Sequence, residues 1–217
     1  MKKSVFNIFM VAVLAVAIVG CKKAKEANTS EAEAAAVAES TSEKFIANVG
    51  ESMIEWKGFK PTGSHTGTIN LESGVFTTND GKVHSGTFLI NMKSIKVTDI
   101  PADKKGNADL VGHLSGADFF DVEKFPGAAF EVTGLEEKEG KSMLSGNLSL
   151  KGVKNNITFP VVVSQDGDNL SLTSEAFTID RSKWNVQYGS KSFFDDLGDK
   201  FINDDIELKI TVKAKKS

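Results

Sequence analysis

The sequence predicts an all-β fold in which antiparallel strands close into a barrel. Three observations indicate this fold. Apolar and polar residues alternate over residues 206–214, turn sequences containing Gly separate consecutive strand-like stretches, and 19 glycines with four prolines fit many turns and few helices. A closed barrel is favoured over an open sheet because closure leaves no strand edge exposed.

The chain opens with a segment that is typical of export. Lys2 and Lys3 precede an apolar run over residues 5–20, which ends directly before Cys21, the single cysteine. The pattern resembles a bacterial lipoprotein signal, in which residues 1–20 are removed and the cysteine becomes the lipid-bearing first residue. Two other interpretations fit less well. A transmembrane helix needs about 20 apolar residues, and an ordinary signal peptide ends in an A-x-A-like site.

We therefore expect lipidation at Cys21 and a location in the bacterial cell envelope. Stable anchoring needs two or more acyl chains, which the triacyl cap implied by the resemblance supplies. Lys22 is not the aspartate that commonly marks inner-membrane retention in enteric bacteria. The expected location is the outer membrane or a periplasmic face rather than the inner membrane.

Residues 21–43 are expected to comprise the lipidated cysteine and a flexible tether. The segment after Cys21 is nearly all Ala, Glu, Lys, Ser and Thr, without an aromatic residue. Such a composition buries too little apolar surface to offset the entropy of ordering, although residues 31–39 favour a transient helix. The predicted organisation is a signal peptide over 1–20, a tether over 21–43 and a barrel domain over 44–217.

The expected strands begin near residue 43. Asp80-Gly81, Glu139-Gly140 and Asp166-Gly167 each lie between two strand-like stretches and predict hairpins. Residues 107–120 and 190–201 break the strand pattern and are expected to form short helices or ordered loops.

The final strand-like stretch gives the clearest indication of an interior face. Leu208 alternates with Glu207 and Lys209, so it is predicted to point inward. An eight-stranded barrel has room either for packed side chains or for one small ligand. The 15 phenylalanines against one tyrosine indicate a dry interior, which fits a self-filled core as well as an apolar lumen.

The charge balance argues against nucleic acid as a partner. The chain carries 26 basic and 29 acidic residues; removing residues 1–20 takes away Lys2 and Lys3, which leaves 24 − 29 = −5. A nucleic-acid binder would instead show a basic face. We expect no nucleic-acid partner.

Six sequence blocks together resemble the YceI-like family of lipid-binding proteins. The blocks are WKG at 56–58, GSHTG at 63–67, HLSGADFFDV at 113–122, FPGAAF at 125–130, SGNLSLKGV at 145–153 and FTIDR at 177–181. The resemblance covers residues 44–215. It implies an antiparallel, eight-stranded, lipocalin-like barrel outside the cytoplasm, whose apolar lumen holds a polyisoprenoid or other amphiphilic lipid.

Seven residues are expected to contact the ligand. They are His65, Phe119, Phe120, Lys151, Arg181, Trp184 and Leu208. Phe119 and Phe120 fit a core position as well as a ligand contact. Arg181 is expected either to form an ion pair with Asp180 or Asp195 or to meet an anionic head group.

The sequence offers little for catalysis. The histidines His65, His84 and His113 lack metal-ligand spacing, and Cys21 is the only cysteine. A cluster of His65, His113 and Asp118 would allow acid–base chemistry only if the fold brought the three together. We expect no catalytic residue, no metal and no cofactor.

These observations favour a binding protein rather than an enzyme. The expected function is to bind, sequester or carry a long-chain amphiphilic lipid such as a polyisoprenoid, at a membrane to which the chain is anchored. Two alternatives stay open: a structural envelope lipoprotein whose barrel is filled by its own side chains, and an enzyme acting on a lipid or quinone head group through His65 or His113.

Overall fold

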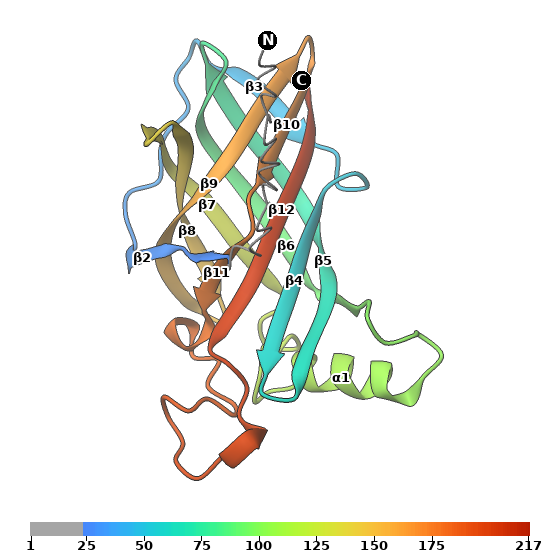
Figure 1. The fold of residues 1–217 in the computed structure, drawn as a ribbon. Helices are drawn as coiled ribbons and strands as arrows, with labels where there is room; N and C mark the ends of the chain where they lie inside the picture. Colours follow the sequence, from blue (N-terminus) through green and yellow to red (C-terminus); the bar gives the residue numbers. More distant parts are fainter. Residues whose placement is uncertain (1–23) are drawn as a thin grey trace, which may run out of the picture.

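The computed structural model describes residues 24–217, and the fold is almost entirely β (Figure 1). Cys21 and the predicted signal peptide lie outside the described residues. The strands are β1 (Lys25–Glu26), β2 (Asn28–Glu31), β3 (Glu43–Ala47), β4 (Met53–Lys60), β5 (Gly63–Asn79), β6 (Lys82–Val97), β7 (Gly127–Lys138), β8 (Lys141–Leu150), β9 (Val153–Asp166), β10 (Asn169–Ser174), β11 (Phe177–Asp180) and β12 (Asp205–Lys216). The helices are α1 (Lys105–Ser115) and two short 3₁₀ helices, η1 (Arg181–Trp184) and η2 (Gly198–Lys200).

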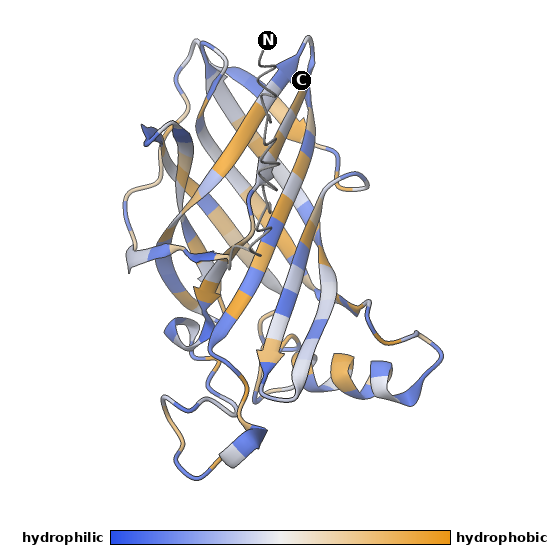
Figure 2. Ribbon diagram, viewed as in Figure 1, coloured by the Kyte–Doolittle hydropathy of each residue, from blue (hydrophilic) through white to orange (hydrophobic). Residues whose placement is uncertain are grey.

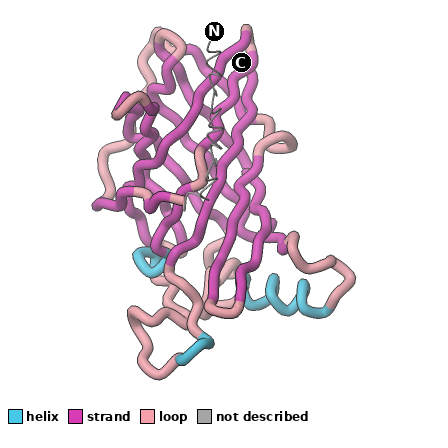
Figure 3. Tube along the Cα trace, in the orientation of Figure 1, coloured by secondary structure: helices cyan, strands magenta, loops and turns pink. Residues whose placement is uncertain are grey.

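The sheet closes into a ring of eight strand positions, all antiparallel. Strands β5 to β9 are hydrogen-bonded in chain order. Strand β12 pairs on one side with β10 and β11, and on the other side with β3 and β4. Both β3 and β4 also pair with β5, which closes the ring. Figure 3 shows the strands inclined around a common interior. The predicted closed, antiparallel, lipocalin-like fold is confirmed.

Two of the eight positions are occupied by a strand that is broken in two. On either side of β12 the neighbouring strand is interrupted, between β3 and β4 and between β10 and β11. A buried serine hydroxyl repairs the ladder at each break: Ser174 Oγ accepts from the Ile210 amide at 2.8 Å, and Ser52 Oγ from the Lys213 amide at 3.0 Å. The serines therefore satisfy backbone amides that the breaks leave without a strand partner.

The three predicted hairpins are present. Asp80-Gly81 joins β5 to β6, Glu139-Gly140 joins β7 to β8, and a turn starting at Gly167 joins β9 to β10. Both residues of the first two turns have positive φ, between 49° and 73°. This conformation is that of the type I′ turn, whose twist matches the flanking strands. Lys151-Gly152 forms a third turn of the same kind, with φ of 47° and 77°.

The two irregular stretches lie at one end of the ring, at the bottom of Figure 1. Residues 105–115 form α1, whose inward face includes the buried Leu114. Residues 190–201 form an ordered loop that contains only the short η2. Both outcomes match the expectation of short helices or ordered loops. Among residues 24–217, no helix is long and apolar enough to cross a membrane.

The segment that was expected to be a free tether packs on the ring from residue 25 onward. β1 pairs in parallel with β11, and β2 pairs with β9. Ala27, between β1 and β2, is only 4% exposed. For these residues the prediction of a flexible coil is wrong, and residues 31–39 are not helical. Their composition supplies little apolar surface, but the edges of β9 and β11 supply backbone hydrogen bonds that composition does not reveal.

The ring differs between its two ends. The filled end, toward the top of Figure 1, contains β3 and β10, and side chains occupy its interior. Phe45 and Phe76 are fully buried, with ring centroids 5.9 Å apart, and Phe88 packs 5.8 Å from Phe76. The hollow end contains β4 and β11, and α1 and the 190–201 loop lie beside its opening.

Candidate functional site

The hollow end encloses an apolar cavity of about 280 Å³. Five of the 29 residues around it carry polar or charged side chains other than Trp, and all others are apolar, aromatic or Gly. Among the described residues, none of those lining the cavity comes from β3 or β10. This volume is near the lower limit of ordinary small-ligand sites, and an apolar lining with a few polar groups is typical of them.

The strand pattern of β12 builds one wall of the cavity. Ile206, Leu208 and Ile210 line the cavity, and the intervening Glu207 and Lys209 point away. Figure 2 shows the same alternation of apolar and polar residues along this strand. The predicted inward orientation of Leu208 is confirmed.

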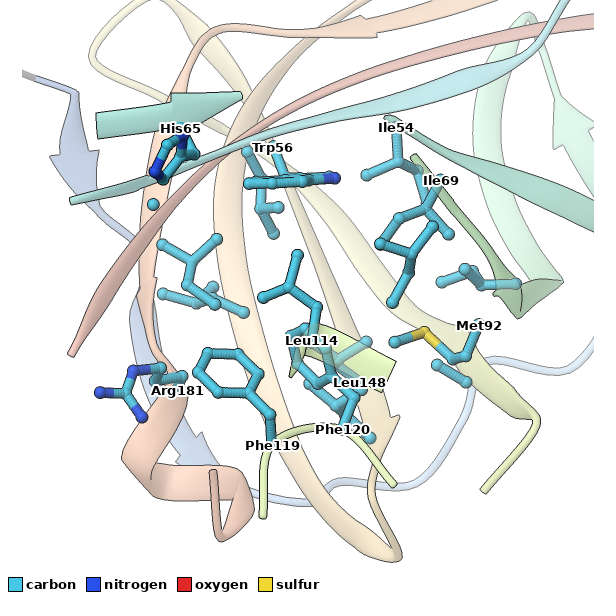
Figure 4. Close-up of a pocket in the computed structure, with 18 of the residues that line it drawn as sticks. Ile54, Trp56, His65, Ile69, Met92, Leu114, Phe119, Phe120, Leu148 and Arg181 are labelled. Atoms are coloured by element: carbon cyan, nitrogen blue, oxygen red, sulfur yellow. The ribbon is translucent and has the colours of Figure 1, made fainter. Parts of the chain in front are cut away.

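Trp56 lies flat along the wall because its neighbour on β5 has no side chain. The two residues are paired across β4 and β5, and a Cβ on Gly67 would lie 2.4 Å from the indole. The indole Nε1 is buried and has no hydrogen-bond partner among the described residues. Figure 4 shows the ring edge-on at the cavity boundary, leaving the lumen open.

The polar lining residues gather at the open end. Lys60 and His65 flank the β4–β5 turn, His113 is on α1, Arg181 begins η1 and Asn203 precedes β12. Figure 4 places His65 and Arg181 on one side of the cavity, away from Met92. We call these five residues the rim. An apolar interior with a polar rim matches a molecule with an apolar tail and a polar head.

The rim histidine is oriented by a carboxylate that the sequence did not indicate. His65 Nδ1 lies 2.8 Å from Asp99 Oδ2, and Asp99 Oδ1 accepts from the Thr66 amide at 2.9 Å. Burial alone would raise the pKa of Asp99, but the hydrogen bonds from Thr66 and His65 hold that pKa below its ordinary value. An ionised Asp99 accepts the proton on Nδ1, so Nε2 is the ring nitrogen left for another partner. The structure pairs His65 with Asp99.

His113 belongs to a group of aromatic side chains at the opening. Its ring lies 5.4 Å from Phe119 and 4.7 Å, edge-on, from Tyr188. These contacts connect α1 to the loop after η1 across the opening.

Arg181 is a fully buried cation whose hydrogen bonds connect the segments of the chain around the opening. Its guanidinium donates to the carbonyls of Val186, Ile202 and Asn203. It forms an ion pair with Asp204 at 3.4 Å, so the predicted partners Asp180 and Asp195 are corrected to Asp204. Burial lowers its pKa, and Asp204 opposes that effect. Arg181 also lies 5.3 Å from the centre of the Phe119 ring, so it contributes to the rim while its donors are directed mainly at the backbone.

Phe119 and Phe120 line the cavity, whereas Lys151 and Trp184 do not. Lys151 Nζ donates to the Phe119 carbonyl and holds that loop in place; burial lowers the pKa of its ammonium group. Trp184 is fully buried behind the wall, where its Nε1 donates to the Leu148 carbonyl at 2.9 Å. In the structure these two side chains support the fold around the cavity, and their contact with a ligand stays a prediction.

The sequence reasoning missed most of the lining. Ile54 and Ile69 face each other across β4 and β5, and Met92 extends the wall from β6. The alternation of apolar and polar residues around these positions is present in the sequence. The sequence does not predict where β3/β4 and β10/β11 are broken, and these breaks decide which end of the ring is hollow. Within residues 24–217, no group of three His, Cys, Asp or Glu side chains is placed to hold a metal ion.

The closed sheet, the apolar cavity and the polar rim define a class: small antiparallel β proteins with an internal site for an apolar ligand. Residues 36–214 match the YceI-like domain, and the chain belongs to that family.

Two curated relatives match part of the chain. A UPF0312 protein from Azotobacter vinelandii is 32% identical over 99 residues, which cover 45% of this chain and 46% of the relative. Protein YceI from Salmonella arizonae is 29% identical over 105 residues, which cover 48% and 51%. The chain thus spans about half the length of the curated relatives it matches.

Two solved structures share the fold. The crystal structure of Burkholderia cenocepacia BcnA has a TM-score of 0.61 at 21% identity and covers 78% of this chain and 99% of its own. A polyisoprenoid binding domain from Saccharophagus degradans has a TM-score of 0.56 at 12% identity and covers 80% and 98%. At these identities the likeness shows the fold alone.

Proposed function

We propose that this protein binds one long-chain amphiphilic lipid, of the polyisoprenoid type, with the tail in the cavity and the head group at the rim. The observation that carries the proposal is the apolar cavity of about 280 Å³ with polar side chains confined to one end. Membership of the YceI-like family and the fold shared with the polyisoprenoid binding domain from Saccharophagus degradans support the same ligand class.

Burial of an apolar tail is favourable without specific polar contacts to that tail. Each CH₂ group that leaves water stabilises the complex by about 0.8 kcal/mol. Leu208, Phe120 and Ile54 offer apolar contact without hydrogen-bonding groups, so branched and linear chains are both compatible. Specificity for the head group therefore depends on the rim.

His65 is the rim residue best placed to recognise a hydroxyl head group. Asp99 orients its ring through Nδ1, and Nε2 is left to hydrogen-bond a hydroxyl group. Lys60 adds a positive charge beside the same turn. A neutral alcohol or phenol, or a singly charged head, fits this combination.

The proposal includes membrane anchoring through Cys21. The apolar run and the lone cysteine support it, and anchoring would keep the carrier next to the source of its ligand. We propose a cell-envelope location, at the outer membrane or a periplasmic face. A Cys21→Ser variant is expected to incorporate no labelled palmitate, and continued incorporation would refute the anchor.

The binding function is tested by lipid extraction and mass spectrometry after the purified protein is incubated with a long polyprenol. The parent is expected to retain about one polyprenol per chain. Leu208→Ala should retain it, because it only enlarges the cavity. Leu208→Asp should lose it, because an unpaired buried charge costs several kcal/mol. Circular dichroism and a thermal melt establish whether each variant is folded. Absence of polyprenol from the folded parent, or equal binding by folded Leu208→Asp, would refute the proposal.

A further inference from the structure

The N-terminal segment fills a gap in the ring at the hollow end. Among residues 24–217, no strand ladder joins β9 directly to β11. Residues 25–31 lie between these two strands instead, because β1 pairs with β11 and β2 pairs with β9. Figure 1 shows this segment in blue, crossing the outside of the ring beside β11. We call residues 25–31 the seam segment.

The cavity lies directly behind this gap. Ile157 and Phe159 of β9 line the cavity on one side of the gap, and Phe177 and Ile179 of β11 line it on the other. The rings of Phe159 and Phe177 stack with their centroids 4.2 Å apart, so side chains rather than a backbone ladder bridge the two strands from within. The seam segment, all of which the structure describes, contributes no lining residue. It therefore closes the wall without forming part of the binding surface.

The two sides of the seam segment are held unequally. On one side, four residue pairs link β2 to β9, and the Asn147 side chain holds the following Glu33 through two hydrogen bonds. On the other side, only two residue pairs link β1 to β11, and the Ala27 amide donates to the Thr178 carbonyl at 2.8 Å. The β1–β11 pairing is also parallel, which is slightly less stable per residue than antiparallel pairing. The joint between β1 and β11 is therefore the weaker side.

Charge weakens this joint further. Glu26 forms an ion pair of 3.3 Å with Lys183, but both side chains are partly exposed, and such pairs contribute little. Glu26 also acts on Asp205 of β12. Burial raises the pKa of Asp205, and the negative charges of Glu26 and Asp180 raise that pKa further. Like charges thus oppose the closure of β1 on β11.

Burial distinguishes the joint from the other elements around the cavity. At the end opening, Arg181 is fully buried and donates to three backbone carbonyls. Displacing it would leave a buried charge without partners, which is strongly unfavourable. In the seam segment, Ala27 is the one buried residue. Because segments with few buried apolar contacts open at the lowest free energy, the joint should open before the end of the ring does.

We propose that the joint between β1 and β11 is a lateral gate, through which a long-chain lipid enters and leaves the cavity while the seam segment stays on β9. The proposal rests on the lipid binding proposed above and adds the route. A slot parallel to the strands admits a long tail sideways, whereas the end opening would require the tail to thread past the rim. Residues 36–214 match the family domain, so the seam segment precedes the matched residues and the gate is an addition to that domain.

The gate is tested with a disulfide across the joint. Glu26→Cys/Thr178→Cys joins two residues that are paired between β1 and β11. Asn28→Cys/Thr158→Cys is the matched control, because it joins the same segment to β9, where the proposal keeps it closed. Both pairs are introduced into the full chain with Cys21→Ser, so that the two new cysteines are the only ones. Intact mass after alkylation of free thiols establishes that each disulfide has formed.

The measurement is the rate at which each protein takes up a long polyprenol from detergent micelles, followed by extraction and mass spectrometry. The β1–β11 disulfide should slow loading by about tenfold or more relative to the same protein after reduction, because the opening of lowest free energy is removed. The final occupancy should not change. The β2–β9 disulfide should load at the same rate before and after reduction. Equal rates for the oxidised and reduced β1–β11 pair would overturn the gate.

A second variant tests the opposite direction. Ala27→Asp places a charge at a buried position in the seam segment, which is unfavourable without a partner, so β1 should leave β11 more often and loading should be several-fold faster. Ala32→Asp, at an exposed position just after β2, should load at the parental rate. Thermal melts establish that both variants are folded. Parental loading by folded Ala27→Asp would also overturn the gate.

The outcomes separate the gate from the proposed function. If the parent binds polyprenol but the β1–β11 disulfide leaves the loading rate unchanged, the gate is refuted while lipid binding stands. If the folded parent binds no polyprenol, the lipid-binding proposal falls and the gate falls with it.

Discussion

The two ends of the ring use the same strand pattern and reach opposite results. At the filled end, inward residues such as Phe45 and Phe76 are fully buried against one another. At the hollow end, inward residues such as Trp56 and Leu208 remain partly accessible around a cavity. The comparison teaches that alternation decides which way a side chain points, but not whether it finds a partner across the ring.

Glycines contribute to both results by opposite means. At the filled end, Gly86 makes room for Phe76: a Cβ there would lie 2.9 Å from the Phe76 Cβ. At the hollow end, Gly67 and Gly146 let Trp56 and Phe130 lie back against the wall; a Cβ on Gly146 would lie 2.2 Å from the Phe130 ring. The first glycine admits a ring to the core, and the other two keep rings out of the lumen.

The largest expected difference between the ends is in stability. Phe76→Ala should lower the free energy of unfolding by about 3–5 kcal/mol, since it leaves a cavity in a packed region. Leu208→Ala should cost about 1 kcal/mol, because Leu208 already faces empty space and little apolar surface leaves contact. Urea denaturation of the two variants measures both values, and equal losses would mean that the ends are packed alike.

The second prediction concerns the glycine at the cavity wall. Gly146→Ala should push Phe130 into the lumen, cost about 1–3 kcal/mol through overpacking, and reduce the amount of polyprenol bound. Gly134→Ala on the neighbouring strand is the matched control, because nothing lies within 4 Å of the added Cβ. If the folded Gly146→Ala protein binds polyprenol like the parent, Phe130 does not border the ligand.

The third prediction concerns the N-terminal segment, which pairs with β9 and β11 at the hollow end. The Asn147 side chain is 2% exposed; its amide group donates to the Glu33 carbonyl at 2.7 Å, and its oxygen accepts from the Glu33 amide at 3.0 Å. Asn147→Ala should destabilise the protein by about 1–3 kcal/mol, the usual cost of leaving buried polar groups unpaired. Hydrogen exchange of residues 25–33 should rise. An unchanged exchange rate would show that this segment is held by other contacts.

The smallest expected effect is a pH dependence at the rim. The pKa of Asp99 is lower in the folded protein than its ordinary value. The stabilisation is therefore fully present above the ordinary aspartate pKa of about 3.9 and is lost as the pH falls through the folded-state pKa. Thermal melts of the parent and Asp99→Asn should differ slightly at neutral pH and converge in acid. A difference that grows in acid would contradict the assigned hydrogen bonds.

Part of the fold and of the candidate site could be predicted from the sequence. The Asp80-Gly81 and Glu139-Gly140 turns and the alternation around Leu208 are local signals, and they predicted hairpins and an interior face correctly. The motif blocks predicted the family and hence the closed sheet.

The remainder depends on contacts between residues that are distant in the chain. The strand breaks at Ser52 and Ser174 are repaired by β12, which follows much later in the sequence. His65 is oriented by Asp99 and Arg181 by Asp204, partners that no motif connects. The packing of residues 25–31 needs the free edges of β9 and β11, so composition alone predicted a coil.

The central claim is that the ligand occupies the hollow end alone, and methyl NMR of the protein titrated with a long polyprenol tests it most directly. The resonances of Ile54, Ile206 and Leu208, which line the cavity, are predicted to shift until one equivalent is bound. Those of the filled-end residues Leu170, Leu172 and Val212 are predicted to stay in place. Shifts confined to the filled end, or no saturable shift at the cavity methyls, would contradict the account.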